Sequence, residues 1–162
     1  MPSRSTSIAL LNVAAASRWL WQLILVAVLA GCANTPATPG APASDDQLYR
    51  DFGGQPGIER LIDGLLDNIA RDDRIYPIFR DANIDRLRGK LIEKFCSLTG
   101  GPCEYTGAPI VEAHSGLKIT EAQFNALVED LIDAMESQNV PVAAQNRLLA
   151  ILAPMRPQVI HR

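Results

Sequence analysis

The side chains of this sequence that bind metals or react most readily include two histidines and three cysteines. His114 lies in the stretch EAHSGLKI, ahead of Gly116 and a helix-start signal, whereas His161 is the penultimate residue. A neutral imidazole nitrogen is a common metal ligand. An isolated histidine, however, more often has a structural or surface role. The stretch around His114 therefore raises the question of a metal ligand without answering it.

Cys96 and Cys103 form a second group of chemically active residues. Their spacing matches neither a CxxC motif nor a zinc ribbon, and His114 is the only histidine near them, so the sequence disfavours a zinc site. A structural disulfide and two free thiols both remain open. The choice depends on the distance and orientation of the two side chains, which the sequence does not give.

Cys32 ends the motif LAGC, which directly follows the apolar run WLWQLILVAVLA over residues 19–30. A membrane-spanning helix needs about 20 apolar residues, so this shorter run fits the h-region of a signal peptide better. LAGC resembles the bacterial lipobox, whose cysteine is acylated on its thiol and becomes the new N-terminus. An ordinary signal peptide or an uncleaved anchor is the alternative. We predict a lipoprotein signal peptide over residues 1–31 and lipid on Cys32.

A lipidated Cys32 would place the chain in the bacterial cell envelope, anchored to a membrane and facing the periplasm. Ala33 follows the cysteine where some lipoproteins carry an aspartate that retains them at the inner membrane, so we favour the outer membrane. The periplasm also permits disulfides.

The remainder of the chain divides by composition. Residues 32–46 are rich in Pro, Ala and Thr and predict an extended tether, whereas residues 47–162 are long enough for one modest core. Removing the leader takes away two of the 15 basic residues and none of the 18 acidic ones. A mildly acidic domain without runs of like charge gives no support for nucleic-acid binding.

Helical periodicity runs through the domain, and we find neither a period-2 strand pattern nor an internal repeat. Apolar residues recur at helical spacing over 58–69, 84–98, 124–135 and 148–155. The third stretch is opened by TEAQ, which is a capping box. Pro154 is expected to bend or shorten the last helix. Glycine-rich connections, FGG and GGPCEYTG, separate the helices and lead toward His114.

These motifs together resemble a group I truncated haemoglobin. The matching stretches are LYRDFGGQPGIERLIDGLL, RDDRIYPIFRDANIDRLRGK, GGPCEYTGAPIVEAHSGLKIT and NVPV, and they cover the chain from Leu48 to about Val159. The resemblance implies an all-α, two-over-two helical sandwich around haem b. It also implies that His114 is the proximal ligand of the iron, with its second ring nitrogen hydrogen-bonded.

The resemblance also implies further haem contacts. Phe79 matches the phenylalanine that packs on the haem face, and Lys90 matches a position that can pair with a haem propionate. A lysine on a helix is more usually only solvated. The candidate cofactor-binding residues are His114, Phe79, Lys90, Leu66, Leu87, Leu91, Phe95 and Leu127.

The departures from the family pattern bear on function. Many group I relatives have a tyrosine at the position of Leu66 and a glutamine at the position of Leu91, and Leu87 and Leu127 add further apolar side chains. A distal donor stabilises bound oxygen by about 1.5–3 kcal/mol through a charge-assisted hydrogen bond. With an apolar distal side we expect fast oxygen release and rapid oxidation of the iron. We therefore do not expect this chain to share the tight oxygen binding or the nitric oxide dioxygenation of its group I relatives.

The favoured function is a membrane-tethered haem protein that reversibly binds oxygen, nitric oxide or carbon monoxide, rather than an enzyme. One alternative is a periplasmic haem oxidoreductase that detoxifies nitric oxide or peroxide; its electron donor is unknown, and no flavin or nicotinamide motif is visible. A second is electron transfer with Lys90 or His161 as the sixth iron ligand. A third, without haem, is a lipoprotein scaffold or a thiol redox protein that uses Cys96 and Cys103.

Overall fold

The computed structural model of the chain describes residues 46–162, and these form helices without a strand. The predicted signal peptide, Cys32 and nearly all of the predicted tether lie outside the described residues. No helix within the described part is both long and apolar enough to cross a membrane. The elements are α2 (Gln47–Asp51), α3 (Gly54–Ile69), α4 (Tyr76–Phe79), α5 (Ile84–Leu98), α6 (Ile110–Ala113), α7 (Glu121–Ser137), α8 (Val142–Leu152) and the 3-10 helix η1 (Ala153–Gln158).

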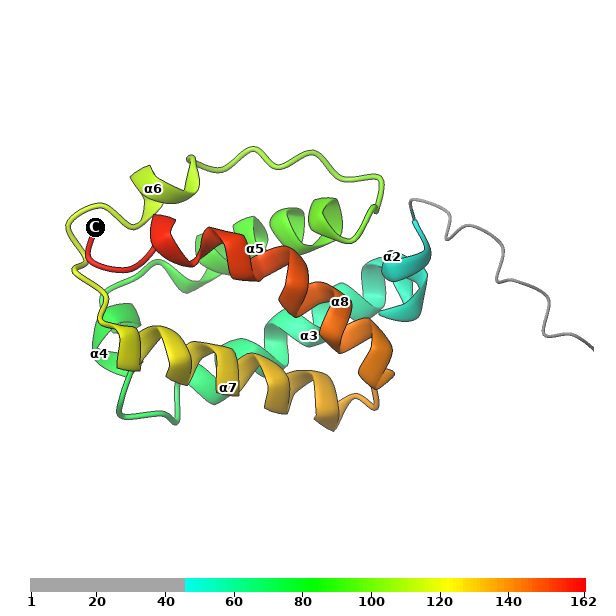
Figure 1. The fold of residues 1–162 in the computed structure, drawn as a ribbon, viewed down its shortest axis with the longest axis horizontal. Coiled ribbons are helices and arrows are strands. Elements are labelled where there is room, and N and C mark those ends of the chain that lie inside the picture. Colours follow the sequence, from blue (N-terminus) through cyan, green and yellow to red (C-terminus); the bar gives the residue numbers. More distant parts are fainter. Residues whose placement is uncertain (1–45) are drawn as a thin grey trace, which may run out of the picture. The chain divides into compact units, whose positions relative to one another are not determined.

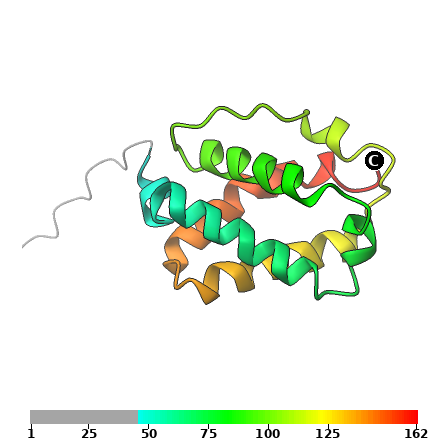
Figure 2. The ribbon, with the colours of Figure 1, turned by 180° about the vertical axis from the view of Figure 1, so that it is seen from behind.

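The long helices form two layers of two. The first layer is α3 with α5, and the second is α7 with α8 and its continuation η1, as Figures 1 and 2 show from opposite sides. The helix α3 contacts both α5 and α7, so it lies at the centre of the packing. The all-α, two-over-two fold predicted from the sequence is confirmed.

The central helix α3 owes its position to its apolar stripe. Ile58, Leu61 and Ile62 are fully buried, and Leu65 and Ile69 are nearly so, which is the spacing that the sequence predicts. Burying an aliphatic side chain of this size contributes about 1.5–3 kcal/mol relative to leaving it exposed. This stripe is therefore a major source of the stability of the helical core.

A tight corner joins α2 to α3. Gly53 has a φ of 84°, which lies in the left-handed region that glycine adopts without strain. A Cβ atom on Gly57 would lie 1.6 Å from the backbone oxygen of Phe52, so a larger residue there would force the two helices apart. The FGG motif and the glycine after Pro56 thus set the angle at which α3 enters the core.

The burial of α5 differs from the predicted stripe. The buried residues are Ile92, Phe95 and Cys96, whereas Ile84, expected at the start of the stripe, is 47% exposed. Leu87 and Leu91 are half-buried. The helix α5 therefore has two apolar sides. The side with Ile92, Phe95 and Cys96 is buried, whereas the side with Leu87 and Leu91 is only partly covered.

The ends of the last helices agree with the sequence signals. Thr120 and Gln123 form the predicted capping box at the start of α7, with both reciprocal hydrogen bonds present. The helix α8 ends at Leu152, and the chain continues as the tighter η1 through Pro154. A proline lacks the N–H that an α-helix needs at this point, so the predicted shortening is confirmed.

Candidate functional site

His114 is the C-cap of α6 and is half-buried. Its Nδ1 lies 2.7 Å from the carbonyl oxygen of Ile110. Because a carbonyl oxygen only accepts hydrogen bonds, Nδ1 carries the proton and donates it, which leaves the lone pair on Nε2. A neutral imidazole with one nitrogen hydrogen-bonded to backbone and the other nitrogen unprotonated is the form that binds a metal ion.

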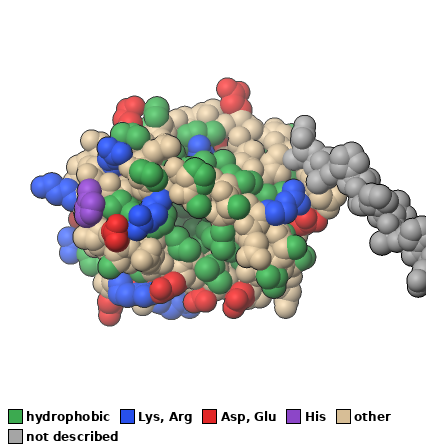
Figure 3. Space-filling view, viewed as in Figure 1, with side chains coloured by type: hydrophobic (Ala, Val, Ile, Leu, Met, Phe, Trp, Pro, Cys, Tyr) green, Lys and Arg blue, Asp and Glu red, His purple; other side chains and the backbone are tan. Residues whose placement is uncertain are grey.

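Apolar side chains from four elements lie around the same core. Leu66 of α3, Phe79 of α4, Leu91 of α5 and Leu127 of α7 are each only partly buried, and each packs against the central cluster of buried residues. Phe95 of α5 belongs to that cluster. Figure 3 shows hydrophobic side chains gathered around a hollow between α7 and the α8–η1 segment. The partial burial of these side chains leaves apolar surface that a large flat apolar group would cover.

Lys90 is engaged by its neighbours. Its Nζ lies 2.8 Å from a carboxylate oxygen of Glu93 and donates to the hydroxyl of Thr106. The backbone N–H of Thr106 also donates to Glu93, at 2.9 Å. The hydrogen bond from Lys90, followed by those from Thr106, lowers the pKa of Glu93 to about 2. The ammonium group, proposed from the sequence as a partner of a haem propionate, is thus held in an ion pair on the side of α5.

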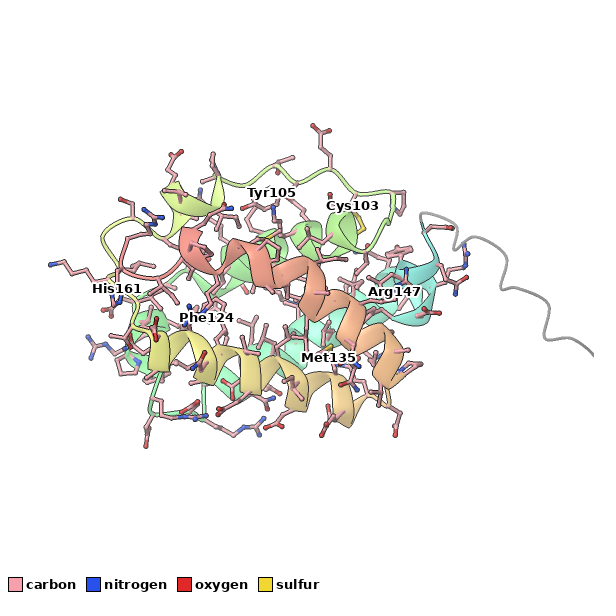
Figure 4. All side chains as sticks on the ribbon, in the orientation of Figure 1. Cys103, Tyr105, Phe124, Met135, Arg147 and His161 are labelled. Carbon is pink, nitrogen blue, oxygen red and sulfur yellow. A yellow bond between two sulfur atoms is a disulfide. The ribbon has the colours of Figure 1, made fainter. Side chains whose placement is uncertain are left out.

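The connection between α5 and α6 runs over α5 and leads to His114; we call residues 100–109 the strap. Cys96 of α5 and Cys103 of the strap form a disulfide, with their Cα atoms 5.7 Å apart. The ammonium of Lys94 lies 4.5 Å from the centre of the Tyr105 ring. Figure 4 shows Cys103 and Tyr105 side by side along the strap, above α5. Of the two states that the sequence left open for the cysteines, the structure contains the bonded one.

The segment after His114 is joined to the C-terminus. The N–H of His161 donates to the carbonyl of Ile119, and the N–H of Lys118 donates to the carbonyl of Arg162, both at 2.9 Å. Figure 4 shows His161 near the C-terminal end of the chain, beyond η1. The second histidine therefore lies beside the segment that follows His114, and its side chain is exposed.

Arg156, which the sequence analysis did not single out, joins η1 to α7. The guanidinium of Arg156 is 5.7 Å from the centre of the Phe124 ring and 3.2 Å from a carboxylate oxygen of Glu121. Phe124 was visible as part of the apolar stripe of α7. Arg156 gave no signal, because its contact requires η1 to fold back along α7.

The imidazole of His114 and the apolar side chains around the core suit an iron porphyrin. Such a group takes one axial imidazole from the protein and needs apolar side chains against a large flat ring. His114 offers Nε2, and the half-buried side chains of Leu66, Phe79, Leu91 and Leu127 offer apolar contact. Among the described residues no three His, Cys, Asp or Glu side chains gather as a metal site of the multidentate kind. The residues present therefore fit haem.

Comparison with known proteins agrees with this geometry. The family described as bacterial-like globin matches residues 47–161. The group 1 truncated haemoglobin GlbN of Mycolicibacterium paratuberculosis is 32% identical over 118 residues, which cover 73% of this chain and 85% of that protein. GlbN of Nostoc sp. is 30% identical over 115 residues, covering 71% of this chain and 98% of that protein.

Solved structures extend the agreement to the fold. The truncated haemoglobin of Tetrahymena pyriformis in its Fe(III) form has a TM-score of 0.69 to this chain at 22% identity, covering 71% of this chain and 98% of that one. THB1 of Chlamydomonas reinhardtii has a TM-score of 0.61 at 24% identity and covers 74% and 98%.

Proposed function

Because the chain belongs to the bacterial-like globin family and is similar to group 1 truncated haemoglobins, we propose that it holds haem b through His114 and binds a diatomic gas reversibly. The observation that carries the proposal is the 2.7 Å contact between Nδ1 of His114 and the carbonyl of Ile110. That contact fixes the tautomer in which Nε2 is the free ligand nitrogen.

His114 and its backbone partner do more than supply a lone pair. A hydrogen bond from Nδ1 to a carbonyl orients the ring and makes Nε2 a stronger base. The helix α6 has only four residues and contacts η1. The position of the imidazole is therefore set from both sides, by the strap before α6 and by the pairing of Ile119 with His161 after it.

The apolar side chains determine what the pocket offers a ligand. When bound here, haem would supply an iron atom that takes a diatomic gas. The side chains of Leu66, Leu91 and Leu127, which pack against the core, carry no hydrogen-bond donor. Oxygen gains most from a donor, because it becomes partly negative on binding, whereas carbon monoxide and nitric oxide depend on one less. The pocket therefore favours the latter two gases relative to a pocket that contains a distal tyrosine or glutamine.

Replacing each of the two histidines in turn tests the role of His114. The variant His114→Ala should lose the Soret band and most of the haem measured as pyridine haemochrome, because Nε2 is removed. The matched variant His161→Ala should keep both, since the His161 backbone rather than its side chain makes the contact with Ile119. A His114→Ala protein with wild-type haem content would show that another residue is the ligand.

We propose a haem iron without a second ligand from the protein, because of where the two candidate residues, Lys90 and His161, lie. Lys90 is paired with Glu93 and Thr106, and His161 is held through its backbone beside Ile119 with its side chain exposed. The contacts of Lys90 support gas binding over electron transfer through a haem with two axial ligands from the protein. A low-spin, six-coordinate ferrous spectrum without added ligand would contradict this and favour electron transfer.

Membrane attachment through Cys32 is the second part of the proposal, and LAGC after the apolar run 19–30 supports it. The variant Cys32→Ser should leave the membrane fraction or remain an unprocessed precursor. Incorporation of labelled palmitate should fall to background. Palmitate that still labels the variant would exclude this cysteine as the lipid site, without bearing on His114.

A further inference from the structure

We propose that the Cys96–Cys103 disulfide positions His114, and that a dithiol reductant which opens this bond weakens the attachment of haem to the chain. The inference rests on the proposed function, because it concerns the iron ligand that His114 supplies. Its physical basis is the way in which the strap is fixed to α5 and the shortness of α6, which has only four residues between the strap and His114.

The disulfide fixes the first half of the strap. The N–H of Gly101 donates to the carbonyl of Cys96 at 2.8 Å. A Cβ atom on Gly101 would lie 2.6 Å from Sγ of Cys96 and 2.7 Å from the ring of Tyr49, so the strap approaches both as closely as its backbone allows. The covalent bond to Cys103 then returns the chain to α5. This part of the strap has little room to move while the bond is closed.

The second half of the strap is held by polar contacts near the surface. The ring of Tyr105 lies under the ammonium of Lys94, and Thr106 hydrogen-bonds to Glu93 and Lys90. Contacts between partly exposed charged groups are individually weak, because water competes for both partners. They orient the strap but would not hold it in place after the covalent anchor is lost.

The path from the strap to His114 is short. Pro109 ends the strap and is the N-cap of α6, whose four residues lead directly to His114. Ala113 and His114 donate backbone hydrogen bonds to Pro109 and Ile110, at 2.9 and 3.2 Å. A displacement of Pro109 therefore moves the turn that carries the imidazole and the carbonyl that fixes its tautomer.

The two sulfur atoms differ in access. Cys96 is 0% exposed, whereas Cys103 is only partly buried. A thiolate of the reductant would attack Sγ of Cys103, and Cys96 would leave as a thiolate and take up a proton. The second thiol of the reductant then attacks the mixed disulfide and releases Cys103. Two electrons and two protons pass from the dithiol to the protein, and the reductant becomes a disulfide.

The test uses the full-length, haem-loaded ferric protein in detergent and measures the rate at which haem transfers to an excess of an apoglobin acceptor. We expect transfer to be about tenfold faster after reduction by a CxxC dithiol protein, and to return to its first value on reoxidation. Peptide mapping after alkylation reports whether Cys96 and Cys103 are bonded in each sample. The matched variant Cys103→Ser should transfer haem rapidly with or without reductant.

A spectroscopic measurement separates positioning of His114 from a general loss of stability. In the ferrous protein, the iron–histidine stretching band in resonance Raman should shift when the disulfide opens and shift back when it closes. An open bond with unchanged haem transfer and an unchanged band would overturn the proposal, as would a bond that the dithiol protein cannot open. Should Cys103→Ser fail to fold, these measurements on the wild type still decide.

Failure of this proposal is distinguishable from failure of the proposed function. If His114→Ala keeps its haem, the ligand assignment is wrong whatever the disulfide does. If His114→Ala loses haem while reduction of the wild type changes neither haem transfer nor the band, the ligand assignment stands and only the role of the disulfide is wrong.

Discussion

The packing of α3 against α7 and the attachment of the strap to α5 are achieved by different interactions. The first involves the long helices whose fully buried residues include Leu61 of α3 and Met135 of α7. The second depends on a disulfide, a cation–π contact and the hydrogen bonds of Thr106 with Lys90 and Glu93 near the surface. Apolar burial is non-directional and stabilises the whole domain, whereas a few directional contacts set the position of one segment.

This difference matches what each region would do. The core must keep the helices folded, and many side chains share that task. The strap must place one imidazole, and a short segment without regular structure needs specific anchors for that. Substitutions in the two regions should therefore differ in both size and kind of effect.

The largest effect is expected in the core. Leu61→Ala removes a fully buried side chain of α3 and should lower the free energy of unfolding by about 2–5 kcal/mol. Urea denaturation followed by circular dichroism measures it. Val142→Ala is the matched control, because Val142 is 69% exposed and its loss should matter little. Equal effects of the two substitutions would mean that α3 is not the centre of the core.

Removal of the disulfide should have a smaller effect on unfolding. The bond joins residues separated by 7 positions in the sequence, and closing so short a loop stabilises by at most about 3 kcal/mol in the chain-entropy model. We expect the double variant Cys96→Ala/Cys103→Ala to stay helical but to unfold at lower urea. A loss larger than that of Leu61→Ala would indicate that the strap, rather than the core, limits the stability of the domain.

The proposed gas-binding side of the haem can be altered at Leu66 of α3. Leu66→Tyr should slow oxygen release by about one to two orders of magnitude, since one charge-assisted hydrogen bond contributes about 1.5–3 kcal/mol. Carbon monoxide release should change much less. Stopped-flow ligand displacement measures both rates. Slow oxygen release in the wild type would reveal a donor that the apolar residues Leu66 and Leu91 do not provide.

The core also contains a group that makes stability depend on pH. Asp130 of α7 is 6% exposed, and its Oδ2 has no hydrogen-bond partner among the described residues. Burial, and then the nearby Asp72, raises the pKa of Asp130. Because the folded state binds this proton more tightly, stability falls as the pH rises from the ordinary value of 3.8 through the raised folded value. Asp130→Asn should remove that fall in chemical denaturation at several pH values, whereas the exposed Asp133→Asn should not.

Glu93 of α5, which is hydrogen-bonded to Thr106 of the strap, changes stability with pH in the opposite direction. The pKa of Glu93 falls from 4.5 to about 2, chiefly through the hydrogen bond from Lys90. Its contribution to stability is therefore present above about 4.5 and is lost as the pH falls toward 2. Since the group is exposed to solvent, we expect only a small effect. In Glu93→Gln, the acid side of the stability profile should flatten, and the alkaline side should stay unchanged. A profile identical to that of the wild type would mean that water screens the Glu93–Lys90 pair completely.

The sequence by itself determined the helical architecture and the family. The stripe Ile58 to Ile69 and the TEAQ capping box are local patterns, and both appear as predicted. The order of the FGG, YTG and AHSGL motifs identified a group I truncated haemoglobin, and the comparisons confirm that resemblance. Periodicity and capping could be predicted because they depend on residues close together in the chain. The order of the motifs can be read directly from the sequence without knowledge of the packing. The predictions for Cys32 and the leader remain predictions, since they lie outside the described residues.

Only the tertiary structure decided which segments distant in the sequence contact one another. The bond between Cys96 and Cys103 depends on a Cα separation of 5.7 Å, and spacing in the sequence does not fix such a distance. Lys90 donates a hydrogen bond to Thr106, which is sixteen positions later in the sequence, because the strap folds back over α5. Ile84 is exposed, contrary to its place in the predicted stripe, because α5 turns Ile92 and Cys96 rather than Ile84 into the core. Helical periodicity shows which residues share a side of a helix, but the partner that covers that side is set by how distant segments pack.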